Sequence, residues 1–128
     1  MPPILIVFLG AGIGGALRHL VNLGCLRACG PDFPVGTMVI NILGSGLMGL
    51  IAGYFAVRAQ ESWAQPARLF LTTGILGGFT TFSAFSLDAA LLYERGDIGM
   101  AAFYVIGSVV ISIAALFFGL ALARTLLA

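Results

Sequence analysis

Four long runs without a charged residue divide this chain of 128 residues. A helix needs roughly 20 apolar residues to cross ~30 Å of hydrocarbon. The charge-free runs cover residues 1–17, 33–57, 69–87 and 98–123. Because apolar residues continue several of these runs, we predict an all-α membrane protein with four transmembrane helices, at about 3–24, 35–57, 67–93 and 98–124.

The composition excludes most soluble classes of protein. Hydrophobic residues make up 60% of the chain and charged residues only 9%, whereas soluble domains are roughly 25% charged. The formal net charge is +1 and the six basic residues, all arginine, are scattered, which argues against a nucleic-acid partner. No nucleophile–base pair, carboxylate pair or phosphate loop is visible, so we do not expect an enzyme. The predicted helices leave room only for short loops, so residues 1–128 should form a single domain in the lipid bilayer.

The arginines are balanced between the two sides of the predicted membrane domain. Arg58, Arg68 and Arg124 fall on the side of the termini, and the other three fall on the opposite side. The positive-inside rule sets orientation through an imbalance of such charges. A balanced chain is expected to insert both ways up, which makes an antiparallel homodimer available. The alternative is one orientation fixed by other means.

Small residues recur at four-residue spacing in every predicted span. Lipid provides no hydrophobic drive between helices, so close approach at small residues holds them together. The sequence therefore predicts helix contacts at four such sets: Gly10 and Gly14, Gly49 and Gly53, Gly74 and Gly78, and Ala115, Gly119 and Ala123.

The third predicted span has weak helix propensity near its middle. Gly77 and Gly78 stand between two pairs of β-branched threonines, 72–73 and 80–81, and such residues disfavour a helix. We expect the helix to be broken at mid-membrane depth, where irregular backbone persists only beside protein or a water-filled cavity. A glycine-rich but continuous helix is the alternative.

Hydroxyl groups repeat every four residues in the fourth span, at Tyr104, Ser108 and Ser112. This spacing puts three hydroxyls in a line on one helix face and indicates a polar track through the membrane. The alternative is that the serines bond back to carbonyls one turn earlier, with Tyr104 at the interface.

The other polar and aromatic candidates carry no negative charge at mid-membrane depth. Asn41 lies deep in the second span, and Phe82 and Phe85 are three residues apart on the third. Amide and hydroxyl groups donate hydrogen bonds, and a phenyl ring is positive at its edge. Neutral donors suit a small anion that must shed water and leave again. Alternatively, the two phenylalanines only pack.

Two stretches resemble the Fluc/CrcB family of fluoride channels. These are residues 77–86 (GGFTTFSAFS) and 36–41 (GTMVIN). The likeness extends over essentially the whole chain, with Arg18 on the first span and the three hydroxyls on the fourth. It implies an antiparallel, dual-topology homodimer in the bacterial plasma (inner) membrane. Its implied function is passive export of fluoride, which lowers fluoride toxicity.

The resemblance also implies roles for particular residues. A structural Na⁺ on the dimer axis would be held by the backbone carbonyls of Gly77 and Thr80 from both chains. Arg18 and Asp88 would be vestibule or structural charges. The position one turn beyond Ser112, where the family usually has a hydroxyl, is Leu116 here. The implied fluoride pathway comprises Asn41, Phe82, Ser83, Phe85, Tyr104, Ser108 and Ser112.

The main alternative function is that of a small dual-topology, proton-coupled multidrug exporter. Proton coupling needs a titratable group in the membrane. Residues 1–17 contain none, and Asp88 lies near the end of the third span. Cys25 and Cys29, expected in the first loop, have too few neighbouring ligands to predict a metal site.

Overall fold

The computed structural model describes residues 1–127, and they are helical except for short connections. Four helical stretches are long and apolar enough to cross a membrane: Pro3–Cys29, Val35–Ala56, Ala64–Glu94 and Ile98–Leu127. They correspond to the four predicted spans. The first is α1 (Pro3–Cys29), the second α2 (Val35–Ala56) and the last α6 (Ile98–Leu127).

The first helix is longer than predicted. The sequence placed residues 25–34 in a loop, but α1 continues through Cys25 to Cys29. It ends where Gly30 adopts a positive φ of 79° and donates its N–H to the Leu26 carbonyl, a helix end that glycine favours. Both cysteines are free and lie on the last turns of α1. The prediction was wrong there because residues 25–29 contain neither glycine nor proline, so the helix continues until Gly30.

The third span is interrupted, as the sequence predicted. Its four segments are α3 (Ala64–Leu69), the π-helical η1 (Phe70–Leu76), α4 (Gly77–Phe79) and α5 (Ser83–Glu94). The break follows α4, where Thr80 is extended (φ −77°, ψ 157°). Gly77 and Gly78 remain helical, so the helix is interrupted at the second threonine pair rather than at the glycines.

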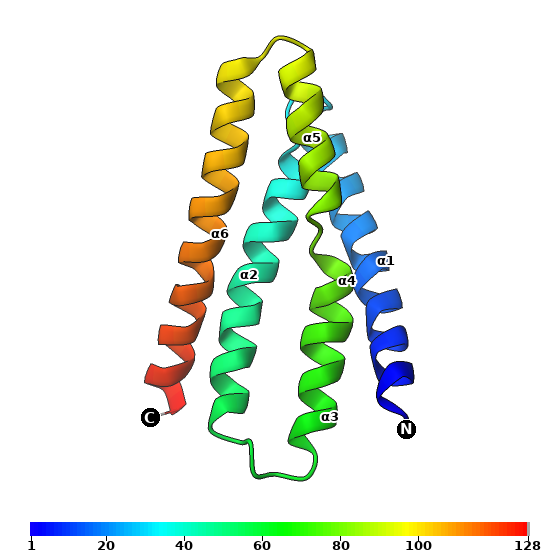
Figure 1. Cartoon of the computed structure of the whole chain (residues 1–128), viewed down its shortest axis with the longest axis vertical. Helices are drawn as coiled ribbons and strands as arrows, with labels where there is room; N and C mark the ends of the chain where they lie inside the picture. Colours follow the sequence, from blue (N-terminus) through cyan, green and yellow to red (C-terminus); the bar gives the residue numbers. More distant parts are fainter. Residues whose placement is uncertain (128) are drawn as a thin grey trace.

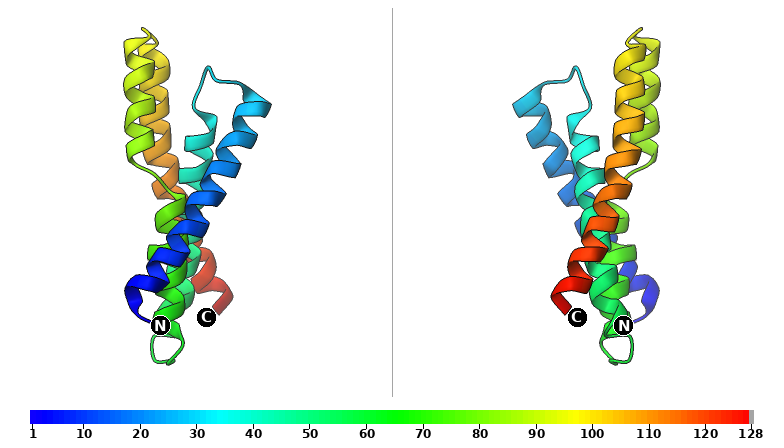
Figure 2. Two further views of the ribbon diagram at one scale, coloured as in Figure 1. Left: turned by 90° about the vertical axis from the view of Figure 1, so that its right-hand side faces the viewer. Right: turned by 90° about the vertical axis from the view of Figure 1, so that its left-hand side faces the viewer.

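Both termini and the α2–α3 loop lie at one end of the molecule, with the two other connections at the opposite end (Figure 1). Arg58 and Arg68 lie near the first end, and Arg27 and Arg95 near the other. Arg18 is inside α1, well before its end. Towards the second end the α5–α6 hairpin diverges from α1 and α2, so that the bundle opens into a V (Figure 2).

Glycines bring two pairs of helices into backbone contact, which confirms their predicted packing role. A Cβ on Gly10 would lie 2.8 Å from the Cα of Gly74. One turn along, a Cβ on Gly78 would lie 2.9 Å from the Cα of Ala11. α2 meets α6 in the same way, since a Cβ on Gly49 would lie 3.0 Å from the backbone N of Leu120. Van der Waals contact between backbones thus replaces the side-chain core of a soluble bundle.

The buried side chains form two small clusters rather than one core. Ile40, Leu76 and Phe79 pack between α2 and the third span. Phe85 and Tyr104 belong to a second cluster between α5 and α6. Most other large apolar side chains face outward; Ile4, for example, is 81% exposed. Outward apolar side chains all round are the pattern of a protein solvated by lipid.

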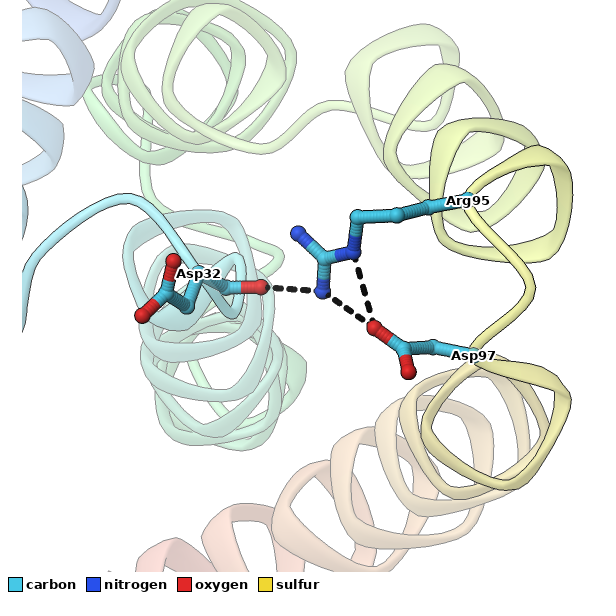
Figure 3. A network of polar contacts seen from close by, with 3 residues as sticks. All are labelled: Asp32, Arg95 and Asp97. Carbon is cyan, nitrogen blue, oxygen red and sulfur yellow. Dashed lines mark hydrogen bonds and ion pairs between the residues drawn. The ribbon is translucent and has the colours of Figure 1, made fainter.

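One polar bridge joins the two halves at the open end of the V. The guanidinium of Arg95 pairs with Asp97 at 2.7 Å and donates to the backbone carbonyl of Asp32 at 2.7 Å (Figure 3). Asp32 belongs to the α1–α2 loop and Arg95 to the α5–α6 turn. Arg95 therefore ties together two connections that are far apart in the sequence.

Candidate functional site

The break in the third span is held by the side-chain amide of Asn41. Asn41 Nδ2 donates to the Thr81 carbonyl, and Thr81 N–H donates to Asn41 Oδ1, both at 2.9 Å. The amide thus replaces the peptide groups that Thr81 would meet in a continuous helix, which satisfies polar backbone in hydrocarbon. Gly44, one turn further along α2, has no Cβ to meet the side chains of Phe79 and Thr80. α2 can therefore approach the break closely.

The pairing with Asn41 leaves backbone carbonyls of the third span without their usual donors. In an α-helix the Gly77 carbonyl accepts from the N–H of residue 81, but that N–H is bonded to Asn41. Likewise, Ala84 N–H donates to Thr81 Oγ1 at 3.2 Å instead of to the Thr80 carbonyl. The Thr81 hydroxyl thereby accepts from an N–H in the first turn of α5, and the carbonyls of Gly77 and Thr80 are available to another donor or a cation.

A groove of about 300 Å³ runs beside the break, between α2 and α6. It brings together residues from α2, the break, α5 and α6. Five of the seven residues predicted for the ion pathway line it: Asn41, Phe82, Phe85, Ser108 and Ser112. The other lining residues, none of them predicted as part of the ion pathway, are Gly44, Ser45, Met48, Thr80, Thr81, Val109 and Leu116.

The two serines of α6 do not bond back to their own helix. Their Oγ atoms are buried and have no hydrogen-bond partner among the described residues 1–127. Other hydroxyls in the chain do bond back, since Thr72, Ser86 and Thr125 each donate to the carbonyl four residues earlier. An unpartnered hydroxyl in apolar surroundings costs free energy, so Ser108 and Ser112 each have a hydrogen bond that the described residues do not supply.

The two phenylalanines touch one another but differ in burial. Their ring centroids are 5.5 Å apart. Phe85 is 8% exposed and packs on Tyr104 at 5.1 Å between centroids, whereas Phe82 is 77% exposed. Phe85 is thus anchored in a core, while the ring of Phe82 projects from the protein surface beside the groove.

Tyr104 does not line the groove with the two serines. Its side chain is completely buried, and its hydroxyl donates to Asp88 Oδ2 at 3.1 Å. Asp88 lies at a second cavity, of about 250 Å³, towards the α1–α2 loop. The predicted line of three hydroxyls is therefore divided. The two serines lie at the groove, whereas Tyr104 lies in a buried cluster and meets the second cavity only through Asp88, because a phenol on a long side chain reaches α5 while a serine hydroxyl stays close to α6.

The remaining candidates lie around the break but outside the groove. Arg18 lines a third cavity, of about 290 Å³, with Thr37 and Thr81. Because Thr81 also lines the groove, this cavity and the groove share the break as a common wall. Ser83 is exposed, and its Oγ lies 3.4 Å from Thr81 Oγ1.

A family model described as CrcB-like protein, Camphor Resistance (CrcB), matches residues 5–120. The chain belongs to the CrcB family. A relative from Nitrobacter hamburgensis, named "Fluoride-specific ion channel FluC 2", is 63% identical over 122 residues, which are 95% of this chain and 97% of the relative. CrcB relatives named "Fluoride-specific ion channel FluC" include one from Rhodopseudomonas palustris, 61% identical over 95% of this chain and 97% of its own.

Another CrcB relative with that printed name, from Agrobacterium fabrum, is 53% identical over 96% of this chain and 97% of its own. The family resemblance inferred from residues 36–41 and 77–86 is thus confirmed. The relatives are named as ion channels, in agreement with the expectation that this chain is not an enzyme. Together with the four spans, they make the chain a multi-pass bacterial membrane protein.

Sequence analysis missed several residues of this site. Thr81 was noted only as a residue of low helix propensity, although its backbone forms the contact with Asn41. Ser45 could have been found, because it follows Asn41 by four residues and so lies on the same face of α2. The π-helical turn in η1 has no signal in the residue types that we considered.

Proposed function

We propose that this chain forms a fluoride-selective channel that lets fluoride leave the bacterial cell passively and so lowers fluoride toxicity. The names of its CrcB relatives support fluoride as the ion. The structural observation that carries the proposal is the groove in which the hydroxyls of Ser108 and Ser112 lack partners beside Phe82 and Phe85.

The chemistry of the groove suits a small anion that passes through. A serine hydroxyl moves between staggered positions by rotation about χ1, so Ser108 and Ser112 can turn their O–H groups to an ion in the groove. Asn41 uses one of its two amide hydrogens for Thr81, which leaves the other free to donate. The groove lining contains no lysine or arginine, so donors replace water without trapping the ion.

We further propose that a second, antiparallel copy closes the groove. Phe82 is 77% exposed beside it, and a second copy would cover this ring and complete the wall of the pathway. The arginines near the two ends number three (Arg58, Arg68, Arg124) and two (Arg27, Arg95), and so small an imbalance supports insertion in both orientations. A two-fold axis in the membrane plane then gives two equivalent pathways.

Sodium fits the break chemically. Hard cations prefer oxygen ligands, and the carbonyls of Gly77 and Thr80 lack helical donors because Thr81 and Ala84 donate elsewhere. Carbonyls from both copies would hold a structural Na⁺ between them. The ion would then satisfy these oxygens at the dimer interface. Preparing the protein with N-methylglucamine in place of Na⁺ should lower dimer stability, as measured by light scattering in detergent.

The primary experiment is fluoride efflux from liposomes that contain the purified protein, followed with a fluoride electrode. We expect fast fluoride loss that needs no proton gradient and is absent for chloride. Drug–proton exchange without fluoride loss would identify the multidrug exporter instead. The absence of both activities would reject a transport function.

Dual topology is tested with paired charge variants. Ala59→Arg with Gln60→Arg adds two charges at exposed positions by the α2–α3 loop, and Ala28→Arg with Cys29→Arg adds two at the opposite end. We expect each variant to insert one way and to be inactive alone, and the two to be active when expressed together. Full flux from one variant, shown by labelling to have a single orientation, would reject the antiparallel dimer.

A further inference from the structure

A third serine lines the groove from the side opposite α6. Ser45 lies on α2, one helical turn after Asn41, and its side chain is half-buried. It shares the groove with Ser108 and Ser112. Donors therefore reach the groove from two neighbouring helices and not from α6 alone.

The height of Ser45 along the membrane follows from the packing of α2 on α6. The two helices run side by side in the same direction (Figure 1). Gly46, the next residue, faces Ala115, since a Cβ on Gly46 would lie 3.8 Å from the Ala115 Cβ. Ser45 is therefore about half a turn beyond Ser112, between the heights of Ser112 and Leu116 and towards the end that holds the termini.

This is the height at which α6 stops supplying hydroxyls. The four-residue series of Tyr104, Ser108 and Ser112 continues to Leu116, whose side chain lines the groove but cannot donate. Met48 is a further apolar lining residue on α2. Without Ser45, an ion that has passed Ser112 would meet apolar groups before it regained water.

The hydroxyl of Ser45 is also unengaged. Serine in a helix commonly donates to the carbonyl one turn earlier, as Ser86 does to Phe82. Within residues 1–127 the structure records no such bond from Ser45, whose acceptor in this geometry would be the Asn41 carbonyl. Ser45 thus resembles Ser108 and Ser112 rather than the hydroxyls that bond back.

We propose that Ser45 donates its hydroxyl to the ion in transit between Ser112 and the end of the groove, so that the pathway passes from α6 to α2 where Leu116 interrupts the first line of donors. This inference rests on the proposed function and adds a residue to it. Because a dehydrated anion needs a donor at each step, Ser45 should set the rate of passage rather than the fold.

The test compares fluoride efflux from liposomes for four proteins at equal protein content. Ser45→Ala is expected to lower flux about five- to tenfold, the effect of one lost hydrogen bond of ordinary strength. Ser45→Ala with Leu116→Ser is expected to recover most of the flux, because it restores a donor at that height. Thr125→Ala is the matched control: it removes a membrane hydroxyl that bonds to the Ala121 carbonyl, and its flux should equal that of the unmodified chain.

Each outcome is decisive. Unmodified flux in Ser45→Ala overturns the role of Ser45 and leaves the proposed function intact. Loss that Leu116→Ser does not reverse, in protein with an unchanged elution volume, also overturns it. If the unmodified chain passes no fluoride, the proposed function fails and the inference fails with it. Should Ser45→Ala not fold, Ser45→Cys keeps the shape with only a weak S–H donor and should show the same loss.

Discussion

The Asn41 side chain and the Thr81 backbone, 40 residues apart, exchange two hydrogen bonds of 2.9 Å. Through this exchange one amide replaces the helical partners of an interrupted span. It also frees the Gly77 carbonyl and orients the start of α5, where Phe82 and Phe85 lie. The break and the free Gly77 carbonyl of the proposed sodium site therefore depend on a single side chain.

Asn41→Ala should remove both bonds and destabilise the protein. Each ordinary hydrogen bond contributes ~1 kcal/mol, and an orphaned buried group costs ~1–3 kcal/mol, so we expect a loss of about 2–4 kcal/mol with complete loss of flux. Thermal unfolding in detergent measures the first and electrode efflux the second. Gln60→Ala, which removes an exposed amide, should change neither. A stable Asn41→Ala protein with normal flux would contradict this account.

The two phenylalanines should respond differently to replacement by isoleucine. We expect both Phe82→Ile and Phe85→Ile to lower fluoride flux at least about tenfold, because the positive ring edge is lost. Phe85→Ile should also lower the thermal midpoint, since the ring is buried against Tyr104, whereas Phe82 has little packing within its own chain. Normal flux in both variants would reject the role of the rings.

Ser108→Ala and Ser112→Ala should separate stability from activity. Both hydroxyls are buried without partners, so their removal should leave the free energy of unfolding unchanged or raise it by about 1 kcal/mol. Flux should fall severalfold in each variant. Thr72→Val is the comparison, because its hydroxyl bonds to the Arg68 carbonyl and should not affect flux. Lower stability in the serine variants would show that their hydroxyls have structural partners.

The glycine contacts predict a sharp contrast between two positions. A Cβ on Gly78 would meet the backbone of Ala11, whereas a Cβ on Gly12 would meet nothing within 4 Å. Gly78→Ala should therefore destabilise the protein by about 1–3 kcal/mol, as overpacking does. Gly12→Ala should stabilise it by roughly 0.5–1 kcal/mol, because alanine favours the helix. Equal thermal midpoints for the two variants would contradict backbone contact at Gly78.

Much of the architecture follows from local properties of the residues. Charge-free runs predict the four spans, because hydrocarbon excludes charge along a whole helix. Paired small residues predict where helices touch, and the glycines and threonines of residues 72–81 mark the weak part of the third span, although the structure is needed to place the break at Thr80. These features need no knowledge of which residues meet across the bundle.

Other features depend on tertiary contacts that residue spacing does not reveal. Thr81 is the partner of Asn41 only because α2 crosses the break at Gly44. Tyr104 shares a helix face with Ser108, yet its longer side chain bonds to Asp88. The continuation of α1 to Cys29 was missed because we placed the start of the loop at Cys25. The residue that ends the helix is Gly30.

Where α1 meets the third span, main chain rests on main chain at Gly10, Gly74 and Gly78. No side chain there can change rotamer to relieve a steric clash, so few substitutions are tolerated along this seam. α6 has a second seam of this kind against α2, at Gly49 and Gly119, whereas α5 contains no glycine and joins the rest through side chains. Sequence divergence that tunes conductance should accordingly concentrate in α5 and the first half of α6, while both glycine seams stay nearly invariant.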